Sequence, residues 1–425
     1  MITSYRDVVA NARKPKGWLD ERAKNGTVIK VVSYNILAQS LLHAHPELYS
    51  ECNKDYLTWS YRSFLLINEL NRFNADILCL QEVEADQLEF FNTQLGEFGY
   101  KGVFKKRTNE KDDGCAIFYK MDKFNLRECI SVEYYQPNIN LLNRDNIGIV
   151  MRLSPKINNN QCIVVATTHL LFNPKRHDIK LAQMQMLLAE IDRVAFKSIS
   201  DSNEPSYYPI ILTGDFNLKP YSLVYNLVVN GTVDNISQCY QNYQFRSPNR
   251  PLIPVRLGIT DGCQHYHVMK NRHLNRTEIS DFQYVKLFNT DRRSLNATDD
   301  NFKLSQNSPL EYDRFGSGSL YHNLKLSSAY PHSDISGGGA TTYQDEWCTV
   351  DYIFYGPSQK VDDDPANPVD GDLKLVSYLK LPDCDQATCL GRLPNEVCPS
   401  DHLPLSATFH LPLQVETPSE MTCKF

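Results

Sequence analysis

Six short polar segments, separated by long stretches of chain, carry side chains suited to the hydrolysis of a phosphate ester. They are Ser33-Tyr34-Asn35, Leu80-Gln81-Glu82, Thr167-Thr168-His169, Gly214-Asp215-Phe216-Asn217, Val350-Asp351-Tyr352-Ile353 and Ser400-Asp401-His402. Each follows or lies in an apolar, β-prone stretch. Because α/β sheets bind ligands at the ends of their strands, we expect these groups to meet at one edge. No single segment is decisive, but the ordered set indicates one site.

Glu82 and Asp401 are the carboxylates best placed for a hard metal ion. Glu82 directly follows the apolar run 77–81, where a carboxylate is costly to bury unless a cation pairs with it. Mg²⁺ prefers oxygen ligands and usually takes one or two protein carboxylates. An exposed loop glutamate explains Glu82 alone equally well. Asn35 could hydrogen-bond a neighbouring carboxylate, or it could cap its own backbone.

Asp215 and Asn217 lie two residues apart, so their side chains face the same way in an extended segment. The carboxylate can orient or deprotonate water, and the amide can donate to a phosphoryl oxygen as charge builds there. Taken alone, the segment also fits an ordinary Asp/Asn turn after a strand.

His402 can donate to phosphate and can carry positive charge near neutral pH. Asp351 is a candidate to hold His402 in one tautomer, and His169 offers a second donor. A satisfied core histidine would explain His169 by itself. Carboxylates, amides and two histidines, without a nucleophilic serine or cysteine, favour attack by water assisted by a metal ion.

Composition and missing motifs exclude several other classes of function. The chain has 425 residues, a formal charge of −6 and a pI near 6.0, which argues against coating nucleic acid through bulk charge. A site for one nucleic-acid end is still compatible, since metal ions neutralise phosphate locally. The sequence has no Gly-x-Ser-x-Gly elbow, no phosphate-binding Gly-rich loop, no dinucleotide fingerprint and no His-Glu-x-x-His.

The twelve cysteines have irregular spacing and form no zinc motif. Cys79 and Cys162 lie in apolar strand-like runs, where a buried free thiol is the default. No run has the length of a signal peptide's apolar region near residue 1, and none approaches a membrane span. We therefore expect an intracellular protein in a reducing compartment, in the cytoplasm or, as the alternative, the nucleus.

Hydrophobic periodicity predicts an alternation of strands and helices. The expected strands are 28–36, 75–81, 114–119, 147–153, 162–168, 208–213, 349–355 and 405–411, and the expected helices are 56–73, 84–95, 179–196 and 222–229. Apolar cores in both kinds of element indicate an α/β layered fold, and short links indicate a mixed sheet.

The predicted domain spans residues 28–412, between a polar lead-in at 1–27 and a tail at 413–425. Residues 236–342 interrupt the rhythm of strands and helices as a long insertion rich in Asn, Ser, Arg, Tyr, Pro and Gly. Loops this long are usually functional or partly disordered, so this one could cover the active site or be a mobile surface excursion. Residues 361–372 are acidic and Pro-rich, and we expect a solvated loop.

With these six segments in this order, the chain resembles the endonuclease/exonuclease/phosphatase superfamily. The resemblance implies a four-layer α/β sandwich like that of deoxyribonuclease I, with two packed mixed sheets flanked by helices. Within the superfamily, the chain is similar to the Angel branch, relatives of the carbon-catabolite-repression-type deadenylases. The segments that carry this likeness are Ser33–Leu37, Asp113–Ile117, Leu142–Gly148, Thr168–Pro174 and Gly391–Glu396.

The resemblance also implies roles for particular residues. Glu82 would hold Mg²⁺ (with Mn²⁺ as an alternative), and Asn35 and Asp401 would complete its surroundings. Asp215 would activate water, Asn217 and His169 would contact phosphate, and Asp351 would support His402. Substrate-binding roles would fall to Asn146, Pro174 and Trp347. Deadenylases stack the terminal adenine on an aromatic residue near the position of Glu346, and Trp347 is the nearby aromatic substitute.

Three functions follow from this likeness. Angel proteins are associated with removal of 2′,3′-cyclic phosphates from RNA 3′ ends, so a metal-dependent hydrolase of RNA ends is the leading hypothesis. A 3′-to-5′ poly(A) exoribonuclease is the alternative, and Glu346 in place of an aromatic residue argues against strict poly(A) preference, since base stacking contributes about 1–3 kcal/mol. An inactive scaffold that binds translation or mRNA-decay factors is the third hypothesis, but every expected polar position is filled.

Overall fold

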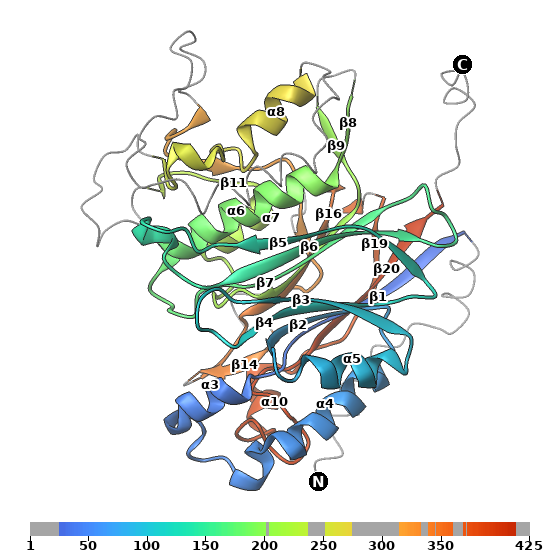
Figure 1. Cartoon of the computed structure of the whole chain (residues 1–425), viewed down its shortest axis with the longest axis vertical. Coiled ribbons are helices and arrows are strands. Elements are labelled where there is room, and N and C mark those ends of the chain that lie inside the picture. Colours follow the sequence, from blue (N-terminus) through green and yellow to red (C-terminus); the bar gives the residue numbers. More distant parts are fainter. Residues whose placement is uncertain are drawn as a thin grey trace.

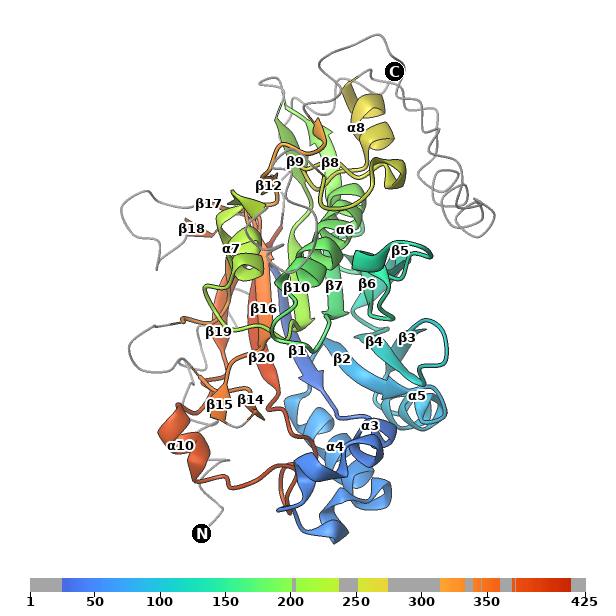
Figure 2. The same cartoon turned by 90° about the vertical axis from the view of Figure 1, so that its left-hand side faces the viewer.

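The protein folds into two six-stranded sheets packed face to face, with helices on both outer faces (Figures 1 and 2). The computed structural model describes residues 25–200, 204–236, 251–273, 314–332, 339–344, 346–359, 369–370 and 372–413. The four layers are those of the deoxyribonuclease I-like sandwich, so the predicted fold class is confirmed.

The first sheet contains both ends of the described domain. Its strands, in spatial order, are β19 (Lys374–Tyr378), β20 (Leu405–Pro412), β1 (Gly26–Asn35), β2 (Ile77–Glu84), β4 (Asp113–Lys120) and β3 (Tyr100–Lys106). β1 runs parallel to β2 and antiparallel to β20, and the remaining pairs are antiparallel. The first and last long strands of the domain are therefore direct neighbours.

The second sheet is mixed in the same way. Its strands, in spatial order, are β13 (Ser327–Ser328), β16 (Asp351–Gly356), β10 (Ile210–Asp215), β7 (Ile163–His169), β6 (Ile147–Pro155) and β5 (Phe124–Glu133). Only β7 and β10 run parallel, and both of their neighbours are antiparallel to them. The predicted mixture of parallel and antiparallel pairs is thus present in both sheets.

Helices cover the outer face of each sheet. The first sheet carries α4 (Trp59–Phe73) and α5 (Leu88–Gly96), and the second carries α6 (His177–Ala195) and α7 (Leu223–Asn230). The described residues also contain short helices and strands: α3 (Gln39–Ala44), α8 (Tyr266–His273), α10 (Cys384–Thr388), β8 (Phe196–Ile199), β9 (Pro205–Tyr207), β11 (Thr232–Val233), β12 (Leu320–Tyr321), β14 (Thr342–Gln344), β15 (Glu346–Cys348), β17 (Ser358–Gln359) and β18 (Val369–Asp370). No helix of the described residues is apolar over a length that would cross a bilayer.

Alternation of side chains along the strands builds three apolar layers. Val31, Ile77 and Val165 belong to the core between the sheets, whereas Val32 and Leu78 face α4 and α5. Neighbouring residues of one strand thus serve different cores, as a period of two requires. Such strands are apolar on both faces, which is why they read as continuous apolar runs in the sequence.

All eight predicted strands and four predicted helices are present, with boundaries shifted by a few residues. The largest shift concerns the predicted helix 84–95, which is wrong in its first turn because Val83 and Glu84 continue β2 beyond a register irregularity. The sequence pattern does not reveal β3, β5 and β19. β5 alternates buried and exposed residues only at its end, which leaves a weak strand signal.

Part of the predicted insertion packs on the outer side of α6. The Gln185 side chain donates to the Thr260 carbonyl at 2.9 Å, and Arg272 pairs with Asp192 at 2.6 Å. α8 lies at the end of the molecule opposite α3 (Figures 1 and 2). The predicted cover over the active site depends on residues 237–250, 274–313 and 333–338, which lie outside the described residues.

The other predicted boundaries also touch undescribed segments. Residues 1–24, 360–368, 371 and 414–425 lie outside the described residues. Of the predicted lead-in, Gly26 and Thr27 already belong to β1. Of the predicted acidic loop, Val369 and Asp370 form β18, which pairs with β17.

Gly214 has the backbone conformation and the close contact that exclude a side chain. Its φ is 144°, and a Cβ atom there would lie 2.0 Å from the Thr168 carbonyl oxygen of the parallel neighbour β7. We expect Gly214→Ala to reduce the free energy of unfolding by roughly 3 kcal/mol or more, measured by urea denaturation. Gly96→Ala is the matched control, because a Cβ atom added there would have no atom within 4 Å, and it should change stability by less than about 1 kcal/mol. Equal effects of the two substitutions would contradict this explanation.

Candidate active site

Strand register brings three predicted residues side by side in the second sheet. Asp215, the last residue of β10, pairs with His169 at the end of β7 and with Asp351 at the start of β16. β16 is antiparallel to β10, so its first residue lies at the same edge as the last residue of β10. Residues 169, 215 and 351 therefore share one end of the sheet, as expected from their positions after or within apolar runs.

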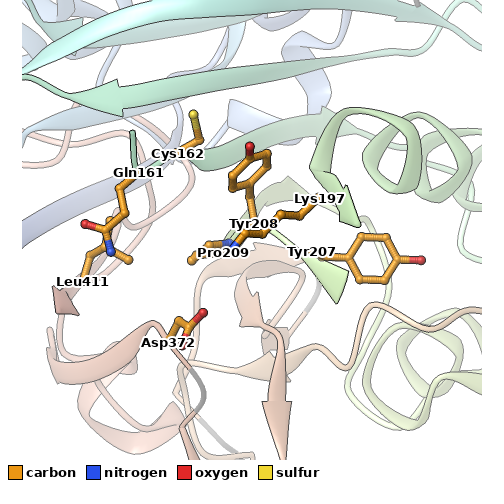
Figure 3. Close-up of a pocket in the computed structure, with 8 residues that line it drawn as sticks. All are labelled: Gln161, Cys162, Lys197, Tyr207, Tyr208, Pro209, Asp372 and Leu411. Carbon is orange, nitrogen blue, oxygen red and sulfur yellow. The ribbon is translucent and has the colours of Figure 1, made fainter. Parts of the chain in front are cut away.

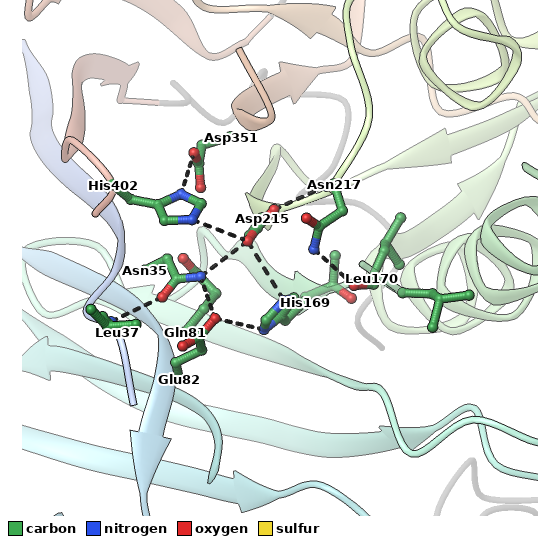
Figure 4. A network of polar contacts seen from close by, with 12 residues as sticks. Asn35, Leu37, Gln81, Glu82, His169, Leu170, Asp215, Asn217, Asp351 and His402 are labelled. Atoms are coloured by element: carbon green, nitrogen blue, oxygen red, sulfur yellow. Dashed lines mark hydrogen bonds and ion pairs between the residues drawn. The ribbon is translucent and has the colours of Figure 1, made fainter. Parts of the chain in front are cut away.

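Asn35 connects this edge to the first sheet. Its Nδ2 donates to Glu82 Oε1 at 2.8 Å and to Asp215 Oδ2 at 3.0 Å (Figure 4). Its Oδ1 accepts from the Leu37 amide at 3.0 Å, which fixes which way the side-chain amide points. One buried amide thus joins a carboxylate from each sheet, and Asn35 lies at the shared centre as predicted.

Two imidazoles flank Asp215. His169 Nε2 lies 3.5 Å and His402 Nε2 lies 3.8 Å from Asp215 Oδ2. His402 Nδ1 lies 2.9 Å from Asp351 Oδ2, and Figure 4 shows the resulting chain of contacts. The geometry expected of an Asp351–His402 pair, with the other ring nitrogen facing the centre, is therefore present.

Two of the central residues adopt a left-handed backbone conformation. The φ angle is 59° at Glu82 and 52° at Asn217. Glu82 occupies the β-bulge at which the register of β2 against β4 shifts, and the bulge re-aims its side chain. Such conformations persist only where surrounding contacts enforce them, and they concentrate at functional sites.

Asn217 is held from two sides. Its amide N–H donates to Asp215 Oδ1 at 2.9 Å, and its Nδ2 donates to the Leu170 carbonyl at 3.1 Å. The buried Lys180 ammonium donates to the Asn217 carbonyl. The Asn217 side chain thus lies beside the residue that follows His169, which suits the predicted contact with phosphate.

Asp401 approaches the centre from the loop before β20. Its Oδ2 accepts from the Tyr49 hydroxyl at 2.8 Å, and Ser400 Oγ donates to the Asn35 carbonyl at 2.7 Å. The His402 amide donates to Ser400 Oγ at 3.2 Å. The segment 400–402 is thereby fixed to the end of β1, with Asp401 close enough to Glu82 for their charges to interact.

Burial and mutual repulsion raise the pKa values of the two central carboxylates. Burial, then the Asp401 and Asp113 carboxylates, raises the pKa of Glu82 to about 7, opposed by the hydrogen bond from Asn35. Burial and the Asp351 carboxylate raise the pKa of Asp215, opposed by His169 and His402. Acidic groups crowded in this way attract a cation strongly.

The two histidines have opposite pKa shifts. Burial lowers the pKa of His169, although the Asp215 carboxylate opposes this. Burial also acts to lower the pKa of His402, but Asp351, Asp215 and Asp401 outweigh it and raise the pKa of His402 well above its ordinary value. These shifts favour the protonated form of His402 and the neutral form of His169.

The acidic group at the centre fits a divalent cation. Ligand atoms of Glu82, His169 and Asp215 lie within 4.8 Å of one another, and so do those of Asp215, Asp351 and His402. The second group is already engaged through the 2.9 Å Asp351–His402 contact, whereas His169 Nδ1 is 4.0 Å from Glu82 Oε1. Asp113, whose carboxylate raises the pKa of Glu82, has a buried Oδ2 atom without a hydrogen-bond donor among the described residues. The Glu82 side of the centre therefore offers carboxylate oxygen atoms, beside the His169 ring, to a divalent cation.

The three predicted substrate-binding residues lie in three different segments of the fold. Asn146 is buried just before β6, and its Oδ1 accepts from Gln183 at 3.1 Å. Pro174 is exposed in the loop between β7 and α6. Trp347 is buried in β15, edge-on to Tyr343 with ring centroids 5.5 Å apart. Their roles in binding substrate stay predictions.

Sequence reasoning misses four residues that support the centre. Arg62 and Lys180 lie in predicted amphipathic helices, where a charged residue is normally assigned to the solvent face, yet both are fully buried. Asp113 stands out in the sequence only as part of a family motif, and Tyr49 precedes the first predicted helix. A cation inside the apolar stripe of a helix is the available signal for Arg62 and Lys180.

A separate pocket lies at the opposite end of β7 (Figure 3). Cys162, Tyr208 and Leu411 are among its lining residues, and His169 closes the other end of the same strand. The pocket therefore does not belong to the catalytic centre.

The chain is similar to known proteins over most of its length. Residues 32–402 match the Endonuclease/Exonuclease/phosphatase family. Protein angel homolog 2 of Homo sapiens is 38% identical over 412 residues, covering 92% of this chain and 71% of that protein. Protein angel homolog 1 of Homo sapiens is 35% identical over 426 residues, covering 89% of this chain and 62% of that protein.

Solved structures show the same relationship. A crystal structure of ANGEL2, described as a 2′,3′-cyclic phosphatase, superimposes with a TM-score of 0.70 at 35% identity and covers 91% of this chain and 96% of that one. The human Nocturnin catalytic domain has a TM-score of 0.50 at 20% identity, covers 90% of this chain and 93% of that one, and shares the fold.

The chain belongs to the endonuclease/exonuclease/phosphatase family, as the family match, the fold and the arrangement of the polar centre together show. Within that family it belongs to the Angel branch, as the motifs in the sequence indicate.

The raised pKa of Glu82 gives the metal-free protein a distinctive pH dependence. The folded protein binds this proton up to about pH 7, while the unfolded chain releases it near its ordinary value of about 4.3. Stability should therefore fall as pH rises between these values, because the folded state binds more protons in that window. Glu82→Gln removes this loss, so at pH 8 without divalent metal it should be more stable than the wild type, by up to about 3 kcal/mol.

Urea denaturation of metal-free protein at pH 5 and pH 8 measures this difference. Glu97→Gln, on the exposed residue that follows α5, is the control and should leave the pH dependence unchanged. Added Mg²⁺ should stabilise the wild type and have little effect on Glu82→Gln. An unchanged pH dependence in Glu82→Gln would show that Glu82 is ionised throughout.

Proposed function

We propose that this protein is a divalent-metal-dependent phosphoester hydrolase that removes 2′,3′-cyclic phosphate from RNA 3′ ends. The main supporting observation is that Asn35 and the imidazoles of His169 and His402 all approach Asp215 Oδ2, in a chain that matches ANGEL2 over 91% of its length. ANGEL2 is described as a 2′,3′-cyclic phosphatase, and one of its structures contains adenosine-2′,3′-vanadate. The same chemistry serves terminal 2′ or 3′ phosphates.

Asp215 is the group that accepts the proton of the attacking water. Its Oδ2 atom is buried and its pKa is raised, so it is a stronger base than an exposed aspartate. Water oxygen forms a bond to phosphorus while one of the two ester bonds of the ring breaks. The departing ribose oxygen takes up a proton, which leaves a monoester and one hydroxyl group. A second attack by water releases inorganic phosphate and the second hydroxyl.

His402 supplies positive charge where negative charge builds on the phosphoryl oxygens. Asp351 holds its Nδ1 at 2.9 Å, so Nε2 is the nitrogen that faces Asp215 and the centre. The side-chain amide of Asn217 and the imidazole of His169 offer two further hydrogen-bond donors. Fixed donors of this kind stabilise a transition state without reorganisation, and removing one typically costs about 10²–10³ in rate.

Glu82, together with Asp401 and Asn35, would hold the metal ion, for which we propose Mg²⁺ with Mn²⁺ as a substitute. The bound ion would supply Lewis-acid polarisation of a phosphoryl oxygen and neutralise its charge. Asn35 orients the Glu82 carboxylate through its 2.8 Å hydrogen bond, and the Ala38 amide donates to the other oxygen of Glu82 at 2.9 Å.

The alternative of a 3′-to-5′ poly(A) exoribonuclease needs a platform for the terminal adenine. Trp347, the predicted substitute, is buried against Tyr343. Glu346, in the same hairpin, is exposed and forms an ion pair with Lys219. An acidic side chain offers no ring for stacking, so this position favours the cyclic phosphatase over the deadenylase.

The cellular compartment and the binding partners of the protein are also proposals. Nine described cysteines carry free thiols, among them the buried Cys79 and Cys115, and this is consistent with the proposed reducing, cytoplasmic compartment. RNA 3′ ends are the proposed partner, and translation or mRNA-decay factors are candidates for protein partners.

A side-by-side assay tests the proposed function. Purified protein with Mg²⁺ is given otherwise identical oligonucleotides that end in 2′,3′-cyclic phosphate, 3′-phosphate or an unmodified oligo(A) tail. We expect conversion of the cyclic end to hydroxyls and no ladder of shortened oligo(A). A ladder with an untouched cyclic end would identify a deadenylase instead, and no turnover of any substrate would support the scaffold.

Asp351→Asn tests the role of the Asp351–His402 pair. Asparagine cannot stabilise the imidazolium, so the pKa of His402 should fall and kcat on the cyclic substrate should drop by about 10²–10⁴ near neutral pH. Affinity for Mg²⁺ should change little, because the metal site lies on the Glu82 side. Asp385→Asn, on the exposed face of α10, is the control and should keep full activity. If Asp351→Asn also kept its activity, His402 would not act as a charged donor.

A further inference from the structure

Arg62 is a completely buried cation in α4, and each of its three guanidinium nitrogen atoms donates to a neutral oxygen atom. Its exposed fraction is 0%. Nε donates to the Pro399 carbonyl at 2.7 Å, Nη1 to Gln39 Oε1 at 2.8 Å, and Nη2 to the carbonyls of Ile36, at 2.6 Å, and of Leu37. Within the described parts of the chain it forms no ion pair. A buried guanidinium without a carboxylate partner is costly, so its position calls for an explanation.

Some of these contacts connect Arg62 to the Glu82 side of the centre. Leu37 has a φ of 60°, a conformation that costs an L-residue roughly 1–2 kcal/mol. This turn presents the Leu37 amide to Asn35 Oδ1 at 3.0 Å and the Ala38 amide to Glu82 Oε2 at 2.9 Å. Arg62 binds the carbonyl groups of residues 36 and 37, so it holds the turn whose amides orient Asn35 and Glu82.

Another contact connects Arg62 to the His402 side of the centre. Pro399, which accepts from Arg62 Nε, directly precedes Ser400. Ser400 Oγ donates to the Asn35 carbonyl at 2.7 Å and accepts from the His402 amide at 3.2 Å. A single side chain therefore clamps two segments of the centre that lie far apart in the sequence.

The cost of burying the Arg62 charge is offset in part by carboxylates at longer range. Burial lowers the pKa of Arg62, and the carboxylates of Asp401 and Glu82 oppose that effect. Arginine suits this task because its planar fork offers five donors in fixed directions, whereas a lysine ammonium is a single compact point of charge.

We propose that Arg62 is a positioning residue of the active site. It acts through the 36–38 turn and through Pro399, and it sets the orientation of Asn35 and Glu82 against that of Asp401 and His402. The part of this proposal that concerns metal affinity rests on the proposed metal-dependent function.

Arg62→Lys is the test variant, with Arg193→Lys as a matched control. Arg193 is also buried, but its guanidinium contacts Glu190 of the same helix and Glu128 of β5, near the C-terminal end of α6. Isothermal titration with Mg²⁺ should show at least about a tenfold weaker affinity for Arg62→Lys. The kcat at saturating Mg²⁺ should fall by about 10²-fold, since small misplacements of catalytic groups have effects of that size. Arg193→Lys should lose stability while it keeps both values.

Hydrogen exchange provides a readout that needs neither metal nor substrate. Peptides that contain residues 36–38 and 399–402 should exchange faster in Arg62→Lys, at a temperature where the β1 and β10 peptides remain protected. Gln39→Ala, which removes one acceptor of the guanidinium, should shift exchange and Mg²⁺ affinity in the same direction by smaller amounts. It serves as the test if Arg62→Lys does not fold.

The outcomes distinguish a failure of the proposed metal-dependent function from a failure of the positioning role of Arg62. Wild-type protein that binds no Mg²⁺ would overturn the proposed metal-dependent function, while exchange in the two segments would still decide the role of Arg62. Unchanged exchange and metal affinity in the folded variant, or equal changes in Arg193→Lys, would overturn the positioning role.

Discussion

A single buried carboxylate, that of Asp215, is the constraint on which the arrangement of the two sheets depends. It receives a hydrogen bond from Asn35 of the opposite sheet and lies beside two imidazoles that come from different segments of the chain. A buried charge without such partners would be strongly destabilising. The sheets must therefore meet with β1 facing the end of β10, and a slip of one residue in either strand would turn these side chains toward the wrong face.

The backbone conformations and the charges of the centre destabilise the folded protein locally. Glu82, Asn217 and Leu37 adopt left-handed conformations, and several acids share a small volume in which their mutual repulsion raises the pKa values of Glu82 and Asp215. Two buried cations counter this, Lys180 at the Asn217 carbonyl and Arg62 at the 36–38 turn. The apolar layers on either side of each sheet supply the stability that lets such a centre persist.

The sequence predicts which residues meet but not how they are held. Asn35, Glu82, His169, Asp215, Asp351 and His402 are recognisable because each lies beside or within an apolar run, and strand ends converge whatever the exact register. The bulge at Glu82 is not predictable, because periodicity gives no signal for one extra residue and Glu84 also fits the start of a helix. Arg62 and Lys180 escape prediction because a charged side chain is normally assigned to the solvent face by its residue type, although both lie within the apolar stripe of their helices. Trp347 is a candidate for stacking on residue type alone, and packing against Tyr343 determines its burial.

The pairing of β1 with β20 has a consequence for the order of events during synthesis. A ribosome makes Asn35 early and His402 near the end of the domain, and the Ser400 hydroxyl joins the second to the first through the Asn35 carbonyl. The nascent chain can form most of the second sheet while β1, in the first sheet, still lacks its neighbour β20. The centre is therefore completed only after residues 400–402 and the final long strand have left the exit tunnel.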